Sequence, residues 1–511
     1  MSQIVISEMS YSYKKYYEPI FENITINMDT DWKLGLIGRN GRGKTTLLKL
    51  VHGELIPDRG GIFKEVDTEF FPYENKSAYI KTVDVIKENI GGLRTMEENL
   101  DDIDILQRYL DADGFEMESR IKKEMYHMRL SEELLEQEFE LLSGGEKTKI
   151  LMIALFLRKN SFILLDEPTN HLDIDGKMAI AEYLSGKKGF IVVSHDREFL
   201  DRVIDHVVSI NKVGIFIEKG NYSTWKNNKD LKEQFEMSTR DKLEREIVSL
   251  GNRAGTARDW AAVAEKKKNP FATHARANGG KAFMRQAKNS EKEVIDNLEE
   301  KKLLLLNYED AKVLELHQDK IEEECLVKVK HLTFGYSDKI LINDISLKIC
   351  SGDIIWIRGK NGAGKSTFLK LLSKRIPNKE VEYAEKLVIS EAYQEPLWQH
   401  GFLEELFMSE SGQDTGAFDR FKELCMTFDL PEDYLERPLE TYSSGEMKKI
   451  DIARALCFNN QLLFLDEPLN YMDVYFREQL EKAIMKYKPT MVFVEHDIRF
   501  GSNVANVVMD L

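Results

Sequence analysis

An eight-residue pattern occurs twice in this 511-residue chain and constrains its fold more than any other feature. The stretch Gly38–Thr45 reads GRNGRGKT and the stretch Gly359–Ser366 reads GKNGAGKS, so both fit G-x-x-x-x-G-K-[ST]. In this pattern the glycines let backbone N–H groups approach phosphate oxygens, the lysine reaches the phosphates, and the final hydroxyl binds Mg²⁺. Each copy follows a short apolar run and precedes a leucine-rich run. The chain therefore predicts two α/β domains, each with a strand, a phosphate loop and a helix.

Both loops predict ATP binding, and two aromatic residues lie at similar distances before them. Tyr13 is 31 residues before Lys44, and Tyr336 is 29 residues before Lys365. This spacing suits a ring against a bound adenine, although a strand aromatic in the core explains it equally well. The predicted loop positions are Gly38, Arg39, Asn40, Gly41, Arg42, Gly43, Lys44, Thr45, Gly359, Lys360, Asn361, Gly362, Ala363, Gly364, Lys365 and Ser366.

A second pair of glycine-containing stretches precedes apolar helical runs. LSGGEKTKILMIALFL places Ser143, Gly144 and Gly145 at a predicted helix N-terminus, which favours phosphate binding. The counterpart YSSGEMKKIDIARALCF has Ser443, Ser444 and Gly445, so a serine replaces the middle glycine. We expect the second copy to be degenerate.

Paired acids follow at the ends of two apolar runs, SFILLDEP and QLLFLDEP. Asp166 and Asp466 are predicted to hold Mg²⁺, together with the hydroxyls of the two phosphate loops. Glu167 and Glu467, one residue on, suit the orientation and deprotonation of an attacking water. Gln394 is a further candidate for Mg²⁺ and water, whereas the first half has Tyr73 near the corresponding place.

A histidine ends one further strand in each half. His195 and His496 are 301 residues apart, while Ser143 and Ser443, like Asp166 and Asp466, are 300 apart. Because these spacings agree, we predict that both histidines belong to the repeat and contact the γ-phosphate as part of the catalytic set.

Composition limits the other possibilities. With 72 basic and 88 acidic residues the net charge is −16, so any nucleic-acid contact has to be local. No apolar run reaches the ~18 residues that a membrane span needs, and the N-terminus lacks a signal-peptide pattern, which predicts a cytoplasmic protein. The four cysteines, without C-x-x-C spacing, are expected to be reduced packing residues.

The repeat divides the chain into predicted domains at 1–221 and 325–511, joined by a linker at 222–324. The distance from lysine to signature serine is 99 residues in the first half and 78 in the second. The extra length coincides with an acidic helical tract, predicted as an arm at about 95–137 that serves for docking or is only a surface elaboration. The linker pattern predicts two long antiparallel helices with a basic tip loop at about 265–281.

With these motifs in place the sequence resembles the ABC ATPases, and LDEPTNHLD is similar to the ABC-F class, which has two ATPase domains and no membrane domain. The resemblance implies a monomer whose two domains close head to tail over two ATP molecules. Lys365, Glu467 and His496 would then face Ser143, and Lys44, Glu167 and His195 would face Ser443. It also implies action on the bacterial 70S ribosome, at the E site, with some members protecting it from antibiotics.

The linker is the part suited to RNA. Within Arg253–Lys288 nine basic residues face two acidic ones, interleaved with aromatic side chains. The resemblance implies contact with P-site tRNA and 23S rRNA, and a long tip loop and Tyr73 are reminiscent of resistance members. The function that we expect is protection of the bacterial ribosome from antibiotics. Two alternatives stay open: a housekeeping translation factor of the same class and the ATPase subunit of an exporter. The RNA-contact candidates are Lys266, Lys267, Lys268, Phe271, His274, Arg276 and Lys281.

Overall fold

The structure of the chain is a computed structural model. It describes residues 2–13, 19–75, 79–170, 172–211, 214–232, 234–235, 314–319, 325–336, 339–412 and 414–511. The chain separates into a unit of Met1–Ser223 with Val313–Leu511, and a second unit of Thr224–Lys312. The predicted tip loop, all seven RNA-contact candidates and most of the predicted helical hairpin lie outside the described residues. Residues 222–232, at the start of the hairpin, are helical, whereas residues 314–319, near its predicted end, form no helix.

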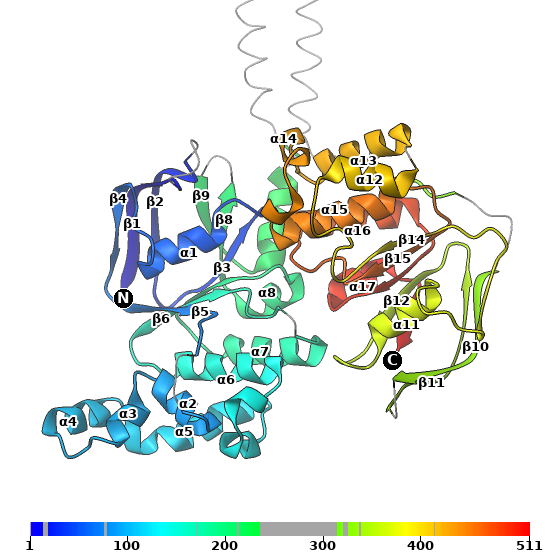
Figure 1. Cartoon of the computed structure of the whole chain (residues 1–511). Coiled ribbons are helices and arrows are strands. Elements are labelled where there is room, and N and C mark those ends of the chain that lie inside the picture. Colours follow the sequence, from blue (N-terminus) through cyan, green and yellow to red (C-terminus); the bar gives the residue numbers. More distant parts are fainter. Residues whose placement is uncertain are drawn as a thin grey trace, which may run out of the picture. The chain divides into compact units, whose positions relative to one another are not determined.

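The first half is built on a six-stranded sheet of order β5-β6-β7-β3-β8-β9 (Figure 1). Its strands are parallel except β9, which is antiparallel to β8. The apolar runs of β3, β6 and β7 are almost wholly buried, as expected for parallel strands covered on both faces. The strands are β3 Lys33–Gly38, β5 Asp67–Phe71, β6 Ser161–Asp166, β7 Phe190–Val193, β8 His206–Asn211 and β9 Gly214–Lys219.

A three-stranded antiparallel sheet of order β2-β1-β4 completes this half, with β1 Gln3–Tyr11, β2 Phe21–Asp29 and β4 Arg59–Lys64. Its apolar face shares a core with helix α1 (Lys44–His52) and strand β3, through residues such as Ile4, Leu34 and Leu47. The core thereby anchors both ends of the first phosphate loop.

The second half repeats this plan. A five-stranded parallel sheet has the order β14-β15-β16-β12-β17, and an antiparallel sheet has the order β11-β10-β13. Helix α11 (Lys365–Leu372) takes the place of α1. The strands are β10 Cys325–Tyr336, β11 Lys339–Cys350, β12 Ile354–Arg358, β13 Val381–Tyr383, β14 Ile389–Ala392, β15 Leu462–Asp466, β16 Met491–Val494 and β17 Val507–Asp510. The predicted fold of two tandem α/β domains is confirmed.

Further helices complete each half, and among them α6 packs on β6 and α15 packs on β14. In the first half they are α2 Thr82–Asn89, α3 Leu93–Glu97, α4 Ile103–Asp111, α5 Met117–His127, α6 Gly144–Phe156, α7 Ile174–Ser185 and α8 Arg197–Val203, with short 3₁₀ helices at Gly114–Glu116, Glu132–Glu136 and Phe139–Leu141. In the second half they are α12 Leu403–Ser411, α13 Thr415–Thr427, α14 Glu432–Leu435, α15 Ser444–Cys457, α16 Val474–Tyr487 and α17 Ile498–Val504, with a 3₁₀ helix at Leu439–Thr441.

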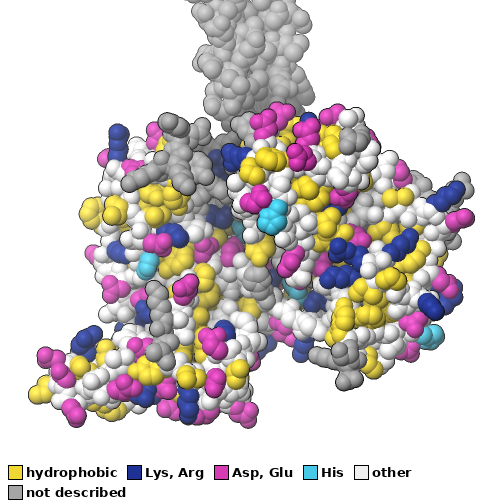
Figure 2. Space-filling view, viewed as in Figure 1, with side chains coloured by type: hydrophobic (Ala, Val, Ile, Leu, Met, Phe, Trp, Pro, Cys, Tyr) yellow, Lys and Arg dark blue, Asp and Glu magenta, His cyan; other side chains and the backbone are white. Residues whose placement is uncertain are grey.

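The extra length of the first half corresponds to α3 and α4, which pack on each other and on α2 and the first 3₁₀ helix. Acidic side chains gather over this region in Figure 2, with apolar side chains among them. Ile103 and Phe115 are 81% and 69% exposed. The docking role and the domain boundaries stay predictions.

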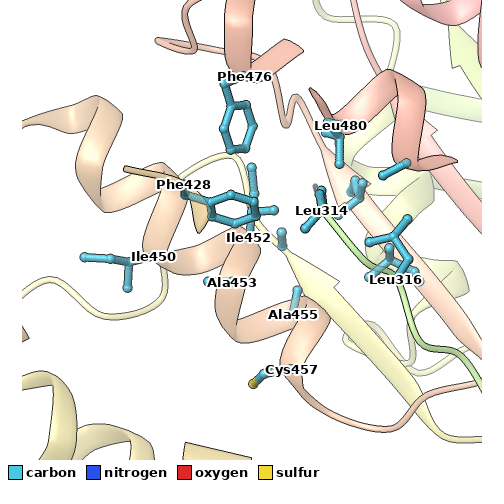
Figure 3. Close-up of a cluster of buried hydrophobic side chains, with 14 of the residues drawn as sticks. Leu314, Leu316, Phe428, Ile450, Ile452, Ala453, Ala455, Cys457, Phe476 and Leu480 are labelled. Atoms are coloured by element: carbon cyan, nitrogen blue, oxygen red, sulfur yellow. The ribbon is translucent and has the colours of Figure 1, made fainter. Parts of the chain in front are cut away.

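A short segment before the second half packs into its core. Leu314 and Leu316 are buried in the core cluster that also holds Phe476 and Leu480 of α16, and Leu314 lies near Leu480 in Figure 3. The side chain of Gln318 donates to the carbonyl of Thr490 over 2.9 Å. Residues 314–319 therefore pack with the second half, ahead of its first strand.

Two further expectations concern the state of the cysteines and membrane-spanning helices. All four cysteines are free, and the thiols of Cys425 and Cys457 are buried, which raises the pKa of Cys457 to about 12. Among the described residues no helix is both long enough and apolar enough to cross a membrane.

Candidate ATP sites

The two phosphate loops have the same backbone geometry. Gly43 and Gly364 immediately precede α1 and α11 with φ values of 84° and 96°, and Gly41 and Gly362 have φ values of 76° and 78°. Glycine adopts this left-handed region without strain. A Cβ atom on Gly43 would also lie 2.5 Å from Ile20 and 2.8 Å from Phe21, so the loop is closely packed from behind.

The loop lysines fold over their own loops. Lys44 Nζ donates to the carbonyl of Gly38 over 2.8 Å, and Lys365 Nζ donates to the carbonyls of Gly359 and Lys360 over 2.9 Å each. Burial lowers the pKa of both ammonium groups, against the opposing effect of nearby carboxylates. Each lysine is thus held where the loop would meet the phosphates of ATP.

The predicted Mg²⁺ ligands are paired in both halves. Thr45 Oγ1 donates to Asp166 Oδ2 over 2.7 Å, and Ser366 Oγ donates to Asp466 Oδ1 over 3.2 Å. Burial raises the pKa of both aspartates. A hydroxyl and a carboxylate at the carboxyl end of a strand are oxygen ligands that fit Mg²⁺, which would neutralise charge on the phosphates.

Glu167 and Glu467 adopt left-handed backbone conformations, with φ values of 50° and 47°. Their N–H groups donate to the carbonyls of Val193 and Val494 over 3.0 Å each. These hydrogen bonds to β7 and β16 fix the start of the turn that leaves the strand, so each carboxylate stands beside the histidine that follows the neighbouring strand.

The surroundings of the two glutamates differ. Glu467 accepts hydrogen bonds from the side chains of Gln394, over 3.2 Å, and Asn470, and lies 3.5 Å from His496 Nε2. Burial opposes its ionisation, but His496 and Asn470 outweigh this effect and lower the pKa of Glu467. The predicted grouping of Gln394, Glu467 and His496 is thus observed in the second site.

In the first site Glu167 Oε1 lies 3.3 Å from His195 Nε2, yet this buried atom makes no hydrogen bond among the described residues. Burial, followed by the charge of Asp166, raises the pKa of Glu167 to about 8. Burial, Lys44 and Arg477 lower the pKa of His195. An unpartnered buried oxygen beside the predicted phosphate position is the kind of group that a bound water would satisfy.

Tyr73 does not take the place of Gln394. Its hydroxyl donates to the carbonyl of Leu151 on α6 over 3.2 Å, and burial raises its pKa. The first site therefore lacks a side-chain amide at this position.

The two tyrosines predicted to contact adenine differ in their surroundings. The hydroxyl of Tyr13 is hydrogen-bonded to Thr46 Oγ1 at 3.2 Å, beside the first loop. Tyr336 is 53% exposed at the end of β10.

Both signature serines cap their helices. Ser143 and Ser443 accept from the N–H groups of Glu146 and Glu446 over 3.3 Å, and each glutamate accepts from the serine N–H in return. The capping box fixes the start of α6 and of α15 by satisfying two backbone N–H groups at each helix. Ser444 occupies the first helical position of α15.

Residues from opposite halves meet at the first site. Asn40 N donates to Asp473 Oδ2, and Asn40 Nδ2 donates to the carbonyl of Tyr471, both over 2.8 Å. A Cβ atom on Gly445 would lie 3.3 Å from Asn40 Nδ2. At the second loop, Lys360 Nζ lies 4.0 Å from Asp175 Oδ2.

Sequence reasoning missed the aspartates that end the motifs, Asp173 and Asp473. Both cap a following helix, and Asp473 also holds the first phosphate loop. Their repetition 300 residues apart was the available signal. Asp196 and Asp497, which follow the two histidines, repeat 301 residues apart and carried the same signal, whereas Arg477 has no sequence pattern that sets it apart from an ordinary surface charge.

The arrangement provides the groups for phosphoryl transfer to water: loop N–H groups and lysines for the phosphates, a carboxylate with a hydroxyl for Mg²⁺, and a glutamate next to a histidine for the attacking water. These elements define a tandem ATPase with two P-loop sites. The profile of the ABC transporter family matches residues 21–170 and 342–470, and the chain belongs to this family. It is an ATPase.

Its relatives include members of the F family. ABC transporter F family member 2 of Arabidopsis thaliana is 28% identical over 534 residues, covering 96% of this chain and 75% of that protein. The energy-dependent translational throttle protein EttA of Haemophilus influenzae is 25% identical, covering 96% of this chain and 89% of that protein. The putative ATP-binding protein YdiF of Bacillus subtilis is 26% identical over 100% of this chain and 80% of its own length.

Solved structures show the same fold at low identity. The archaeal ribosome recycling factor aABCE1, in complex with the stalk protein aP1, aligns with a TM-score of 0.59 and 20% identity over 98% of this chain and 87% of that chain. RNase-L inhibitor aligns with a TM-score of 0.58 and 20% identity, over 99% and 87%.

Proposed function

We propose that this ATPase acts on the bacterial 70S ribosome, binding at the E site. One observation carries the proposal: the match to the translational throttle protein EttA spans 96% of this chain, and therefore includes the segment between the ATPase halves. A relative that shared only the ATPase domains would say nothing of this segment. ATP binding and hydrolysis would then time entry and release.

Within this function we propose protection of the peptidyl-transferase centre from lincosamide, pleuromutilin and streptogramin A antibiotics. The support is the basic stretch Arg253–Lys288, the one strongly positive part of an acidic chain. Positive charge with interleaved aromatic side chains is suited to 23S rRNA and P-site tRNA. The tip loop Lys266–Lys281 would carry the contact that excludes the drug.

The first test is sedimentation with ribosomes. A Glu167→Gln, Glu467→Gln variant, which retains ATP and cannot deprotonate the water, should co-sediment with 70S ribosomes in ATP and dissociate in ADP. The matched control adds Lys44→Ala and Lys365→Ala, which remove the phosphate contacts and should abolish co-sedimentation. Equal recovery of both variants would show that ATP does not control binding.

The second test separates protection from other ribosomal roles. Drug susceptibility is measured in bacteria expressing the chain, or a variant with Lys266–Lys281 replaced by a Gly-Ser connection of equal length. Resistance that disappears with the loop, while the ATPase rate persists, supports the proposal. Resistance that survives the replacement contradicts the role of the loop.

A housekeeping translation factor is the second candidate, and the similarity to EttA favours it equally. Such a factor would act on stalled ribosomes without altering drug susceptibility. Unchanged inhibitory concentrations for all three drug classes, together with ATP-dependent ribosome binding, would establish this alternative.

A further inference from the structure

Arg477 is buried on α16, and each of the three nitrogens of its guanidinium group donates a hydrogen bond. Its Nε donates to the carbonyl of Met472 over 3.0 Å, one terminal nitrogen donates to the carbonyl of Leu469 over 2.9 Å, and the other donates to Asp497 Oδ2 over 2.9 Å. The two carbonyls belong to the turn between β15 and α16, and Asp497 directly follows His496. One side chain therefore ties this turn to the loop that carries the histidine.

The turn held by Arg477 is the turn that contacts the first phosphate loop. Asp473 and Tyr471 accept the two hydrogen bonds of Asn40 described above, each over 2.8 Å. The carbonyls bound by Arg477 lie on either side of Tyr471 in the chain. Fixing them fixes the direction of the Tyr471 carbonyl and of the Asp473 side chain.

The residue of the first half that corresponds to Arg477 is Lys177 on α7. Lys177 Nζ lies 3.1 Å from Asp196 Oδ2, and Arg477 forms the equivalent ion pair with Asp497. An ammonium group is a compact charge, whereas a guanidinium presents a planar fork of five donors that can hold several acceptors at fixed angles. In the second half this fork holds two carbonyls of the turn and Asp497, and the turn that it holds meets the first ATP site.

We propose that Arg477 is a positioning residue for ATP hydrolysis at the first site. It acts through the turn 469–473, which it holds against Asn40 of the phosphate loop. Burial, Lys44 and the positive charge of Arg477 together lower the pKa of His195 in the same site. Loss of the fork shifts the turn and with it the phosphate loop.

A double-mutant cycle tests this route. In the Glu467→Gln background only the first site keeps its glutamate, and ATP turnover is measured for Arg477→Lys, Asn40→Ala and the combination. Each single change should lower kcat/KM about tenfold, since small displacements of reacting groups are costly. The combination should lose little more than either single change, because both act through the same contact.

The control is Arg454→Lys. Arg454 is an equally buried arginine of the same half, bonded to Asp451 and to the carbonyl of Glu391 on β14, away from the turn. Its effect should add to that of Asn40→Ala. Additive losses for Arg477→Lys as well would overturn the proposal and leave Arg477 a purely structural residue. If Arg477→Lys does not fold, Asp497→Asn loosens the same arginine and completes the same cycle.

Discussion

The side-chain amide of Gln394 donates to the carboxylate of Glu467 over 3.2 Å. In the first half the corresponding stretch presents Tyr73, whose hydroxyl is bonded to the helix behind it. One glutamate is consequently held by an amide and the other is not. The two ATP sites have the same backbone and different side-chain support.

This difference predicts unequal effects of removing the glutamates. Changing both Glu167 and Glu467 to Gln should preserve ATP binding and lower turnover by at least about 100-fold, because the amide keeps the shape and loses the base. Glu467→Gln alone should slow steady-state turnover more than Glu167→Gln alone. Rates are measured by phosphate release at saturating ATP, and equal losses from the two single changes would contradict the predicted asymmetry.

The hydroxyl of Thr45, which is hydrogen-bonded to Asp166, should contribute to Mg²⁺ affinity. Thr45→Ala should raise the Mg²⁺ concentration needed for half-maximal turnover by about tenfold. The neighbouring Thr46→Ala is the control, since its hydroxyl contacts Tyr13 instead. A Mg²⁺ titration of ATPase rate decides the matter; identical curves for both variants would remove Thr45 from this role. Chelation of Mg²⁺ should abolish turnover in every variant.

Exchange of the signature residues should show what Ser444 does. An added Cβ on Gly144 meets no atom within 4 Å, so Gly144→Ser should change stability by no more than about 0.5 kcal/mol. In the Glu167→Gln background it should nevertheless slow the second site, because the expected head-to-tail arrangement would place the new side chain beside the phosphates bound there.

The reciprocal Ser444→Gly should not slow the first site in the Glu467→Gln background. Turnover and thermal unfolding are measured side by side for both exchanges. If Gly144→Ser leaves turnover of the second site unchanged, the serine is a neutral replacement and the asymmetry has another origin.

Leu314 should stabilise the second half from outside the repeat. Its side chain is 3% exposed in the cluster with Leu480, so Leu314→Ala should cost about 2–5 kcal/mol by leaving a cavity. Met485→Ala, at a position of α16 that is 52% exposed, is the control and should have little effect. Hydrogen exchange of the second-half strands in the intact chain reports the difference, and equal protection in both variants would argue against this packing.

Much of the site was predictable from sequence because its chemistry requires particular residues at particular spacings. The phosphate loops, the Asp-Glu pairs and the histidines each need one residue type, and two copies at matching distances exclude coincidence. The parallel strands were predictable for the same kind of reason, since a strand buried on both faces has to be apolar throughout. These features depend on neighbours within a few residues.

The contacts between distant segments were decided by the tertiary structure. Tyr73 illustrates the limit: its place in the chain suggested a substitute for Gln394, but its hydroxyl is hydrogen-bonded to the carbonyl of Leu151 on α6 instead. Arg477 is the opposite case, a residue that the sequence did not single out and that the structure places beside the site. Nothing in the helix pattern distinguishes it from an exposed charge. Its role arises from two carbonyls and a carboxylate that only folding brings within 3.0 Å. A buried guanidinium requires such partners, and sequence spacing alone does not specify them.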